Sequence, residues 1–154
     1  MAHEHHFAAR LVWTGAAQGP TKDYESYSRE YRIEIEGKPP LAGSADPTFR
    51  GDPGKHNPED LLVASLSACH LLSYLHLCAS AGIEVVAYED QASGRMAIKD
   101  RRMRFTEVTL APKVTIAAGD LEKAEALHEQ AHAACFIANS VNFPVLHTPT
   151  VTRA

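Results

Sequence analysis

Residues 57–82 read NPEDLLVASLSACHLLSYLHLCASAG, and this stretch decides the fold. Asn57 can cap the first amides of a helix, and Pro58 suits the first helical position. The two acidic residues that follow lie where the helix dipole favours negative charge, and Gly82 fits a left-handed C-terminal stop. These signals predict one helix, which carries no charged side chain from 61 to 81.

The leucines of this predicted helix lie on all of its faces, so the helix is expected to be buried all round. The run is also long enough to span a bilayer. However, it contains three serines and two histidines, and the chain has neither a second apolar span nor a basic cluster beside the first. A central helix wrapped by a sheet is therefore predicted, with no membrane partner.

The composition bounds the class of protein. A chain of 154 residues, 45% hydrophobic and 22% charged, suits one globular domain over residues 1–154. Its net charge of −4, without a lysine and arginine cluster, disfavours nucleic acid as a partner. The first residues do not form a signal peptide, so a cytoplasmic location is expected. Three widely spaced cysteines are expected to stay reduced there.

Alternation of apolar and polar residues predicts the strands, and a second apolar stripe predicts another helix. The predicted strands are residues 7–14, 24–36, 41–44, 83–99, 104–116 and 144–152; the second helix is 120–135, with a helical turn at 136–141. This order predicts an α+β domain. Because so few strands cannot cover a helix that is apolar all round, we expect a homodimer with the central helices inside it.

Cys69 lies in the middle of the apolar helix and is followed directly by His70. It is either a small core hydrophobe or a reactive thiol. A reactive thiolate would need a cation beside it, because burial alone raises a thiol pKa. The nearest upstream candidates are Arg50 and Arg29. Cys78 points to the opposite face of the helix from Cys69 and is interpreted as core.

Cys135 ends the second helix and has two interpretations. It is either core or a resolving thiol, which would condense with a sulfenic acid on Cys69 to form a disulfide. Sequence spacing leaves both interpretations open.

The second helix also contains His128-Glu129-Gln130-Ala131-His132, which matches the zinc protease pattern H-E-x-x-H. The two histidines share a helix face, and Glu129 could act as a base. A third protein ligand has no clear source apart from His147. The alternative is an amphipathic helix with histidines at its edge, and no metal is predicted.

Three features together carry a resemblance to a family: the run N-P-E-D-L-L from residue 57, a cysteine ten residues after Glu59, and a second cysteine on a late helix. Over nearly its whole length the chain resembles the OsmC/Ohr family, the osmotically inducible protein C and organic hydroperoxide resistance proteins. The resemblance implies a two-layer sandwich whose strands wrap a long buried central helix, in an intertwined homodimer. It also implies a thiol peroxidase, without a cofactor, that reduces organic hydroperoxides in the oxidative stress response.

The resemblance assigns roles to individual residues. Cys69 matches the peroxidatic cysteine, Cys135 matches the resolving cysteine, and Glu59 matches the carboxylate that pairs with an active-site arginine. Arg50 matches that arginine in OsmC-type members and is favoured, whereas Arg29 occupies the region used by Ohr-type members. An external dithiol would reduce the disulfide again.

Two residues depart from the family pattern: Phe136 stands where the family often has proline, and His70 resembles a less characterised branch. Glu59 and Cys69 are ten residues apart, about 15 Å along one continuous helix. To contact the same guanidinium, either the helix must break between them or Glu59 must come from the other subunit. Two other functions stay open: binding of a small apolar ligand in a dimer pocket without turnover, and a zinc hydrolase built on His128, Glu129 and His132.

Overall fold

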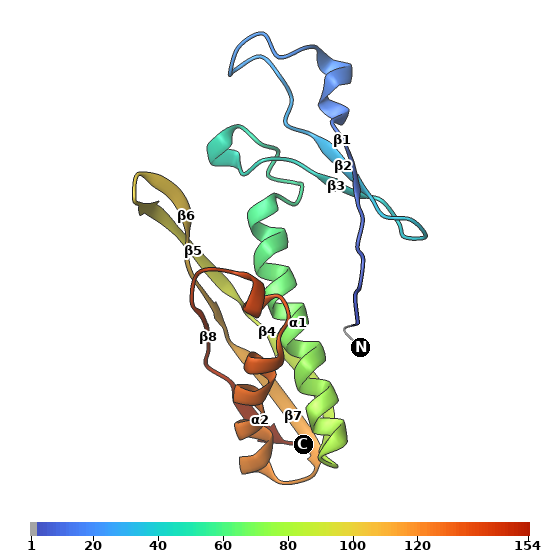
Figure 1. Cartoon of the computed structure of the whole chain (residues 1–154), viewed down its shortest axis with the longest axis vertical. Coiled ribbons are helices and arrows are strands. Elements are labelled where there is room, and N and C mark those ends of the chain that lie inside the picture. The colour runs from blue at the N-terminus through green and yellow to red at the C-terminus, as the bar shows by residue number, and fades with distance from the viewer. Residues whose placement is uncertain (1–2) are drawn as a thin grey trace. The chain divides into compact units, whose positions relative to one another are not determined.

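The computed structural model describes residues 3–154, and in these it has two α-helices and three small sheets of three strands each (Figure 1). The elements are β1 Arg10–Val12, β2 Tyr31–Glu34, β3 Leu41–Gly43, α1 Pro58–Ser80, β4 Glu84–Asp90, β5 Ser93–Lys99, β6 Arg102–Leu110, β7 Pro112–Ala118, α2 Leu121–Ala134, β8 Val145–His147 and β9 Thr150–Arg153. Three 3-10 helices lie in the loops: η1 Thr14–Gln18, η2 Pro47–Phe49 and η3 Ala138–Ser140. The prediction of an α+β fold is confirmed.

The chain forms two compact units, Met1–Leu61 and Leu62–Ala154. The prediction of a single domain over residues 1–154 stays a prediction. The first unit holds an antiparallel sheet in the order β1-β2-β3. Tyr31 and Gly43 are partners in this sheet, and the tyrosine ring occupies the space that a side chain on Gly43 would need. Strands β1 and β2 are shorter than the predicted strands 7–14 and 24–36, because the backbone pairing between them covers only residues 10–12 and 32–34.

Helix α1 begins and ends where its capping residues predict. The Asn57 side chain accepts a hydrogen bond from the Asp60 amide at 2.8 Å, and Gly82 has a φ of +72° in the stop that follows the helix. The helix is unbroken over its 23 residues. Among residues 3–154 it alone has the length and composition of a membrane span, a property that core helices of soluble proteins share.

Only one face of α1 is buried within the chain. Leu66, His70, Tyr74 and Cys78, spaced four residues apart, form the buried stripe. Leu72, on another face, is 68% exposed. The sheets of one chain therefore cover only one side of the helix, as expected from so few strands, and burial of its other side by a second copy stays a prediction.

The second unit contains two sheets, in the orders β4-β7-β9 and β5-β6-β8. In each sheet one neighbouring pair is antiparallel and the other parallel. The single strands predicted over 83–99, 104–116 and 144–152 are wrong. Each is two strands, β4 and β5, β6 and β7, or β8 and β9, and the chain changes sheet between them.

Asp90 ties these corners together at the end of β4. Its carboxylate accepts one hydrogen bond from the Ala111 amide at 2.7 Å, at the corner between β6 and β7. It accepts a second from the Ser67 hydroxyl on α1, at 2.5 Å. One side chain therefore links two sheet corners to the long helix.

The core of the second unit lies between its helices and sheets. One cluster joins α1 and α2 to the β4-β7-β9 sheet, and another joins Leu66 to the β5-β6-β8 sheet. The Asp120 side chain caps α2 by accepting from the Lys123 amide at 2.6 Å, and Cys135 is its C-cap. The second predicted helix and the helical turn after it, η3, are both confirmed.

Candidate functional site

The structure brings Cys69 and Cys135 together in the second unit, and we call them the thiol pair. Cys69 lies on α1 and is half-buried, whereas Cys135 at the end of α2 is only 1% exposed. The Ala138 amide donates to the Cys135 sulfur at 3.5 Å. The two thiols are close enough for Cys69 to raise the pKa of Cys135, and both cysteines are free. An accessible thiol thus lies beside a sheltered one.

Burial raises the pKa of the Cys135 thiol to about 11, and the neighbouring Cys69 thiol adds to the rise. The Ala138 amide opposes this shift by its hydrogen bond to the sulfur. Cys135 is therefore a protonated thiol at neutral pH. Cys78 lies in the core cluster with Tyr74, and burial raises its pKa, which agrees with its interpretation as a core residue.

The first unit contains a cavity of about 510 Å³, which we call the arginine cavity. Its lining is largely apolar and aromatic, with one arginine and two acidic residues. The lining residues are Leu11, Trp13, Thr21, Tyr27, Arg29, Tyr31, Ser44, Ala45, Asp46, Phe49, Pro58 and Glu59. A cavity of this size and lining is typical of a small-molecule site.

Arg29 is held at the wall of this cavity by two tyrosines. Its guanidinium carbon lies 3.8 Å from the ring centroid of Tyr27 and 4.8 Å from that of Tyr24. Its nitrogens donate hydrogen bonds to the backbone carbonyls of the same two residues. The aromatic rings and carbonyls therefore fix a permanent cation beside an apolar space.

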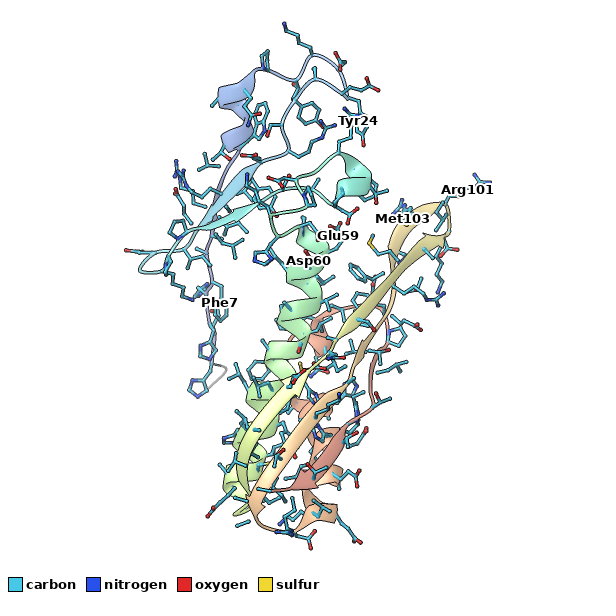
Figure 2. The ribbon with its side chains drawn as sticks, turned by 180° about the vertical axis from the view of Figure 1, so that it is seen from behind. Phe7, Tyr24, Glu59, Asp60, Arg101 and Met103 are labelled. Atoms are coloured by element: carbon cyan, nitrogen blue, oxygen red, sulfur yellow. The ribbon has the colours of Figure 1, made fainter. Side chains whose placement is uncertain are left out.

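Glu59 lies in the first turn of α1, where Figure 2 labels it beside Asp60. It is half-buried and lines the arginine cavity with Arg29, although residues 3–154 show no ion pair between them. Burial raises the pKa of Tyr31, and the charges of Glu59 and Asp60 raise it further. Arg50, the favoured arginine, is exposed, ends η2 with a φ of +66° and is not among the lining residues.

The unbroken helix decides one of the two geometric alternatives for Glu59. The alternative of a helix break between Glu59 and Cys69 is wrong, because α1 is continuous from Pro58 to Ser80. Ten residues of helix separate the two side chains by about 15 Å along the axis. Within one chain, Glu59 and Cys69 therefore do not meet around one guanidinium.

Sequence reasoning grouped three histidines only as possible zinc ligands, and it did not place His70 beside them. The histidine cluster consists of His70 from α1, His128 and His132 from α2, and His147 from β8. His70 and His128 are fully buried, and their ring nitrogens Nε2 and Nδ1 are 3.0 Å apart in a hydrogen bond. The rings of His70 and His147 have centroids 5.7 Å apart, and those of His132 and His147 are 5.4 Å apart.

Burial is the main cause that keeps the central pair of this cluster neutral. It lowers the pKa of His70 to about 4 and that of His128 to about 3, and neighbouring imidazoles lower both further. The position of His70 on the stripe of Leu66, Tyr74 and Cys78 was the available sequence signal, since that spacing faces one side of a helix.

The structure arranges the H-E-x-x-H motif differently from a zinc site. His128 faces His70, while the largely exposed Glu129 carboxylate lies 3.2 Å from His147 Nε2. Over the described residues, no group of three or more histidine, cysteine, aspartate or glutamate side chains is placed to hold a metal ion.

Comparisons with known proteins agree with the fold and extend it. The OsmC family, described as OsmC-like protein, matches residues 51–149. An OsmC-like protein of unknown function from Vibrio cholerae is 30% identical, with a TM-score of 0.87 over 96% of this chain and 100% of that one. A search of curated proteins gives no significant match.

Two structures with organic hydroperoxide resistance in their names share the fold at lower identity. The protein from Elizabethkingia anophelis, solved with thiocyanate bound, is 20% identical, with a TM-score of 0.71 over all of both chains. A proposed resistance protein from Vibrio cholerae, with captopril in one of its active sites, is also 20% identical. Its TM-score is 0.69 over 99% of this chain and 94% of that one. From the family match and the 30% identical structure together, this chain belongs to the OsmC-like family.

Proposed function

We propose that this chain is a thiol-dependent reductase of organic hydroperoxides that works as a homodimer. The observation that carries the proposal is the thiol pair, in which a half-buried Cys69 lies beside a buried and protonated Cys135. An accessible thiol can react with the oxidant, and a buried thiol beside it can then form a disulfide with the oxidised sulfur. Distant structural relatives named for organic hydroperoxide resistance support the same class of substrate.

The proposed reaction has three steps. The Cys69 thiolate attacks one peroxide oxygen, the O–O bond breaks, and the alcohol leaves with a proton, so that Cys69 becomes a sulfenic acid. The Cys135 sulfur then attacks the Cys69 sulfur; the S–S bond forms, the S–O and S–H bonds break, and water leaves. An external dithiol finally reduces the disulfide by thiol exchange.

The arginine cavity is proposed to serve a Cys69 that belongs to a second copy of the chain. Arg29 could stabilise the thiolate and the leaving oxygen, and Glu59 could balance its charge. Since α1 holds Glu59 and Cys69 about 15 Å apart, these roles require the two groups to come from different subunits. The apolar lining favours an organic hydroperoxide over hydrogen peroxide. Both arginine assignments are tested below, since Arg50 remains the alternative cation.

The first experiment counts thiols after one equivalent of cumene hydroperoxide is added to reduced protein. We expect two thiols to disappear, with mass spectrometry mapping a disulfide between Cys69 and Cys135. The Cys69→Ser variant should lose none, and Cys135→Ser should lose one and stop at the sulfenic acid. Survival of all three thiols in the wild-type protein would defeat the proposal.

A mixing experiment tests whether the site is shared between subunits. Dimers of Cys69→Ser and dimers of Arg29→Ala are each expected to be inactive. After subunit exchange, a mixed dimer would hold one intact site, so an equal mixture should recover about a quarter of wild-type activity. No recovery would place the arginine in the same chain as its cysteine. Arg50→Ala is the matched control, and complementation by Arg50→Ala alone would reassign the cation.

A second candidate function rests on the cavity itself. Its volume and apolar lining suit a small ligand, and a structural relative carries captopril in an active site. Equal affinity of wild-type and Cys69→Ala protein for an apolar ligand, without hydroperoxide consumption, would favour binding without turnover.

A further inference from the structure

We propose that His70 and His128 are positioning residues for disulfide closure, because their hydrogen bond sets the register of α2 against α1 that keeps Cys135 beside Cys69. The inference rests on the proposed function for its biological use. Its test does not need hydroperoxide, so the two can fail separately. Neither histidine has to contact the substrate or gain a proton.

The two helices are joined by a pair of polar contacts in an antiparallel ladder. His70 on α1 bonds to His128 on α2 at 3.0 Å. One turn further along α1, the Tyr74 hydroxyl donates to the Ala124 carbonyl at 2.9 Å, one turn earlier on α2. The Tyr74 ring also stacks on His128, with centroids 3.8 Å apart. These contacts define the register of the two helices, that is, the position of α2 along the length of α1.

Both cysteines are tied to this ladder through the backbone. Cys69 directly precedes His70, and Cys135 follows His128 by seven residues, two turns along the same helix. A slip by one turn would move Cys135 by about 5.4 Å. A disulfide needs a Cβ to Cβ separation near 4 Å, so even a fraction of that slip would prevent it from closing.

A histidine pair specifies the register in a way that apolar packing does not. Apolar contacts are non-directional and tolerate small shifts. Both imidazoles are fully buried, so a shift would leave two buried nitrogens without partners. Their second nitrogens, His70 Nδ1 and His128 Nε2, already lack a hydrogen-bond partner in the described residues, so neither ring has another bond to exchange for this one.

The groups around the pair leave it intact at neutral pH. The His147 ring lies near His70, and the His132 ring lies near His147. Glu129 pairs with His147 rather than with the central pair, and the charge of Asp90 opposes the lowering of the His70 pKa without overcoming it. Burial lowers the pKa of both central imidazoles, so one donates and the other accepts as neutral rings. The closure itself balances without them: in oxidised dithiothreitol, two thiols become one disulfide while the reagent is reduced to its dithiol.

The test measures the equilibrium of the Cys69 and Cys135 dithiol with reduced and oxidised dithiothreitol, and the alkylation rate of Cys69 by iodoacetamide. In His70→Leu we expect the equilibrium constant for disulfide formation to fall about tenfold or more, since departures from disulfide geometry strain the bond and make it easier to reduce. Alkylation of Cys69 should stay within about twofold, because Cys69 lies on α1 and is already half-buried beside Cys135 in the wild-type protein. His70→Gln, which places a donor near the Nε2 position, should recover most of the loss. His76→Gln, on an exposed turn of the same helix, is the matched control and should behave as wild type.

A second variant keeps the inference testable if His70→Leu does not fold. His70→Leu/His128→Leu removes both polar partners together, which is far milder than leaving one unpaired. A folded double variant that closes the disulfide as wild type does would overturn the proposal. So would failure of His70→Gln to recover closure, or an equal fall in alkylation, which would indicate a general structural role. If the wild-type protein ignores hydroperoxide but closes the disulfide with dithiothreitol, the proposed function fails while this inference is still decided.

Discussion

The buried histidine pair should make the stability of this protein fall steeply in mild acid. His70 and His128 are fully buried, and burial lowers their pKa values to about 4 and about 3. An unfolded histidine titrates near pH 6.5. As the pH falls below that value, the unfolded chain therefore binds protons that the folded chain does not bind. The stability that the neutral pair contributes is complete above about pH 6.5. It is lost progressively as the pH falls from there to about pH 4 for His70 and to about pH 3 for His128.

The size of the effect follows from the width of that window. Each pH unit inside it changes the free energy of unfolding by about 1.4 kcal/mol for each histidine. Between pH 7 and pH 5, about 1.5 pH units lie below the unfolded pKa of 6.5. The free energy of unfolding therefore falls by about 2 kcal/mol for each histidine. The pair together should lower the free energy of unfolding by up to about 4 kcal/mol. Most domains have only about 5–15 kcal/mol in total, so this loss is large.

Three hydrogen-bonded carboxyl groups should contribute little to this range. The hydrogen bonds that they accept lower the pKa values of Glu34, Asp46 and Asp52, which moves their titration further below pH 5. Measurements between pH 5 and pH 7 therefore isolate histidines from these groups.

The assay is urea unfolding at pH 5, 6 and 7, with reducing agent present and the protein concentration fixed, because dimerisation would make stability depend on concentration. Wild-type protein should show the full slope. The double variant His70→Leu/His128→Leu should lose less than about 1 kcal/mol over the same range. His76→Gln should keep the wild-type slope. A double variant as sensitive to pH as wild type would show that other groups cause the effect, and a flat wild-type profile would refute the reasoning.

Three further predictions follow from single side chains. Iodoacetamide at pH 8 should alkylate Cys69 at least about a hundredfold faster than Cys135. Cys135 is buried, and a pKa near 11 leaves only about one part in a thousand of it as thiolate. Peptide mass spectrometry measures both rates. Asp90→Ala should lower the free energy of unfolding, measured in urea, by about 2–3 kcal/mol, since it removes both hydrogen bonds at the sheet corners. Glu89→Ala, at an exposed neighbouring residue, should change the same free energy by less than about 0.5 kcal/mol. Asn57→Ala should reduce stability by about 1 kcal/mol through loss of the α1 cap, and an unchanged urea midpoint would contradict the capping argument.

The sequence was most informative where structure depends on local signals. The ends of α1 follow from a capping asparagine, an N-terminal proline and a glycine stop, all of which act within a few residues. The Asp120 cap placed α2 in the same way. The family motifs depend on the same local spacing, so a single sequence is enough to show them.

The strand boundaries could not be predicted because extended backbone continues through a sheet corner. Alternation of apolar and polar residues looks alike whether a strand continues or changes sheet. The break after β4 depends on Asp90, whose partners lie 21 and 23 residues away in the sequence. A contact of that range leaves no periodic signal in a single sequence.

The residue types of the candidate site were visible in the sequence, whereas their arrangement in space was not. Reactivity needs a thiol and a cation, and those residue types were visible in the sequence, including both Arg29 and Arg50. The choice between the arginines depends on whether a loop folds toward the cavity, and the structure lines the cavity with Arg29. The place of His70 beside the other three histidines was hidden because the four come from three elements, so only the fold brings them together.

Helix α1 carries one residue of each half of the proposed chemistry. Its first turn carries Glu59 beside the arginine cavity, and its middle carries Cys69 beside Cys135. An unbroken helix cannot bend back on itself, so no rotamer change brings Glu59 to the Cys69 of its own chain. Peroxide reduction by the proposed mechanism should therefore depend on assembly of two copies, while disulfide closure depends only on the two helices of one copy. A substitution that weakens the dimer should mimic loss of the arginine in activity and leave the dithiothreitol equilibrium of the thiol pair unchanged.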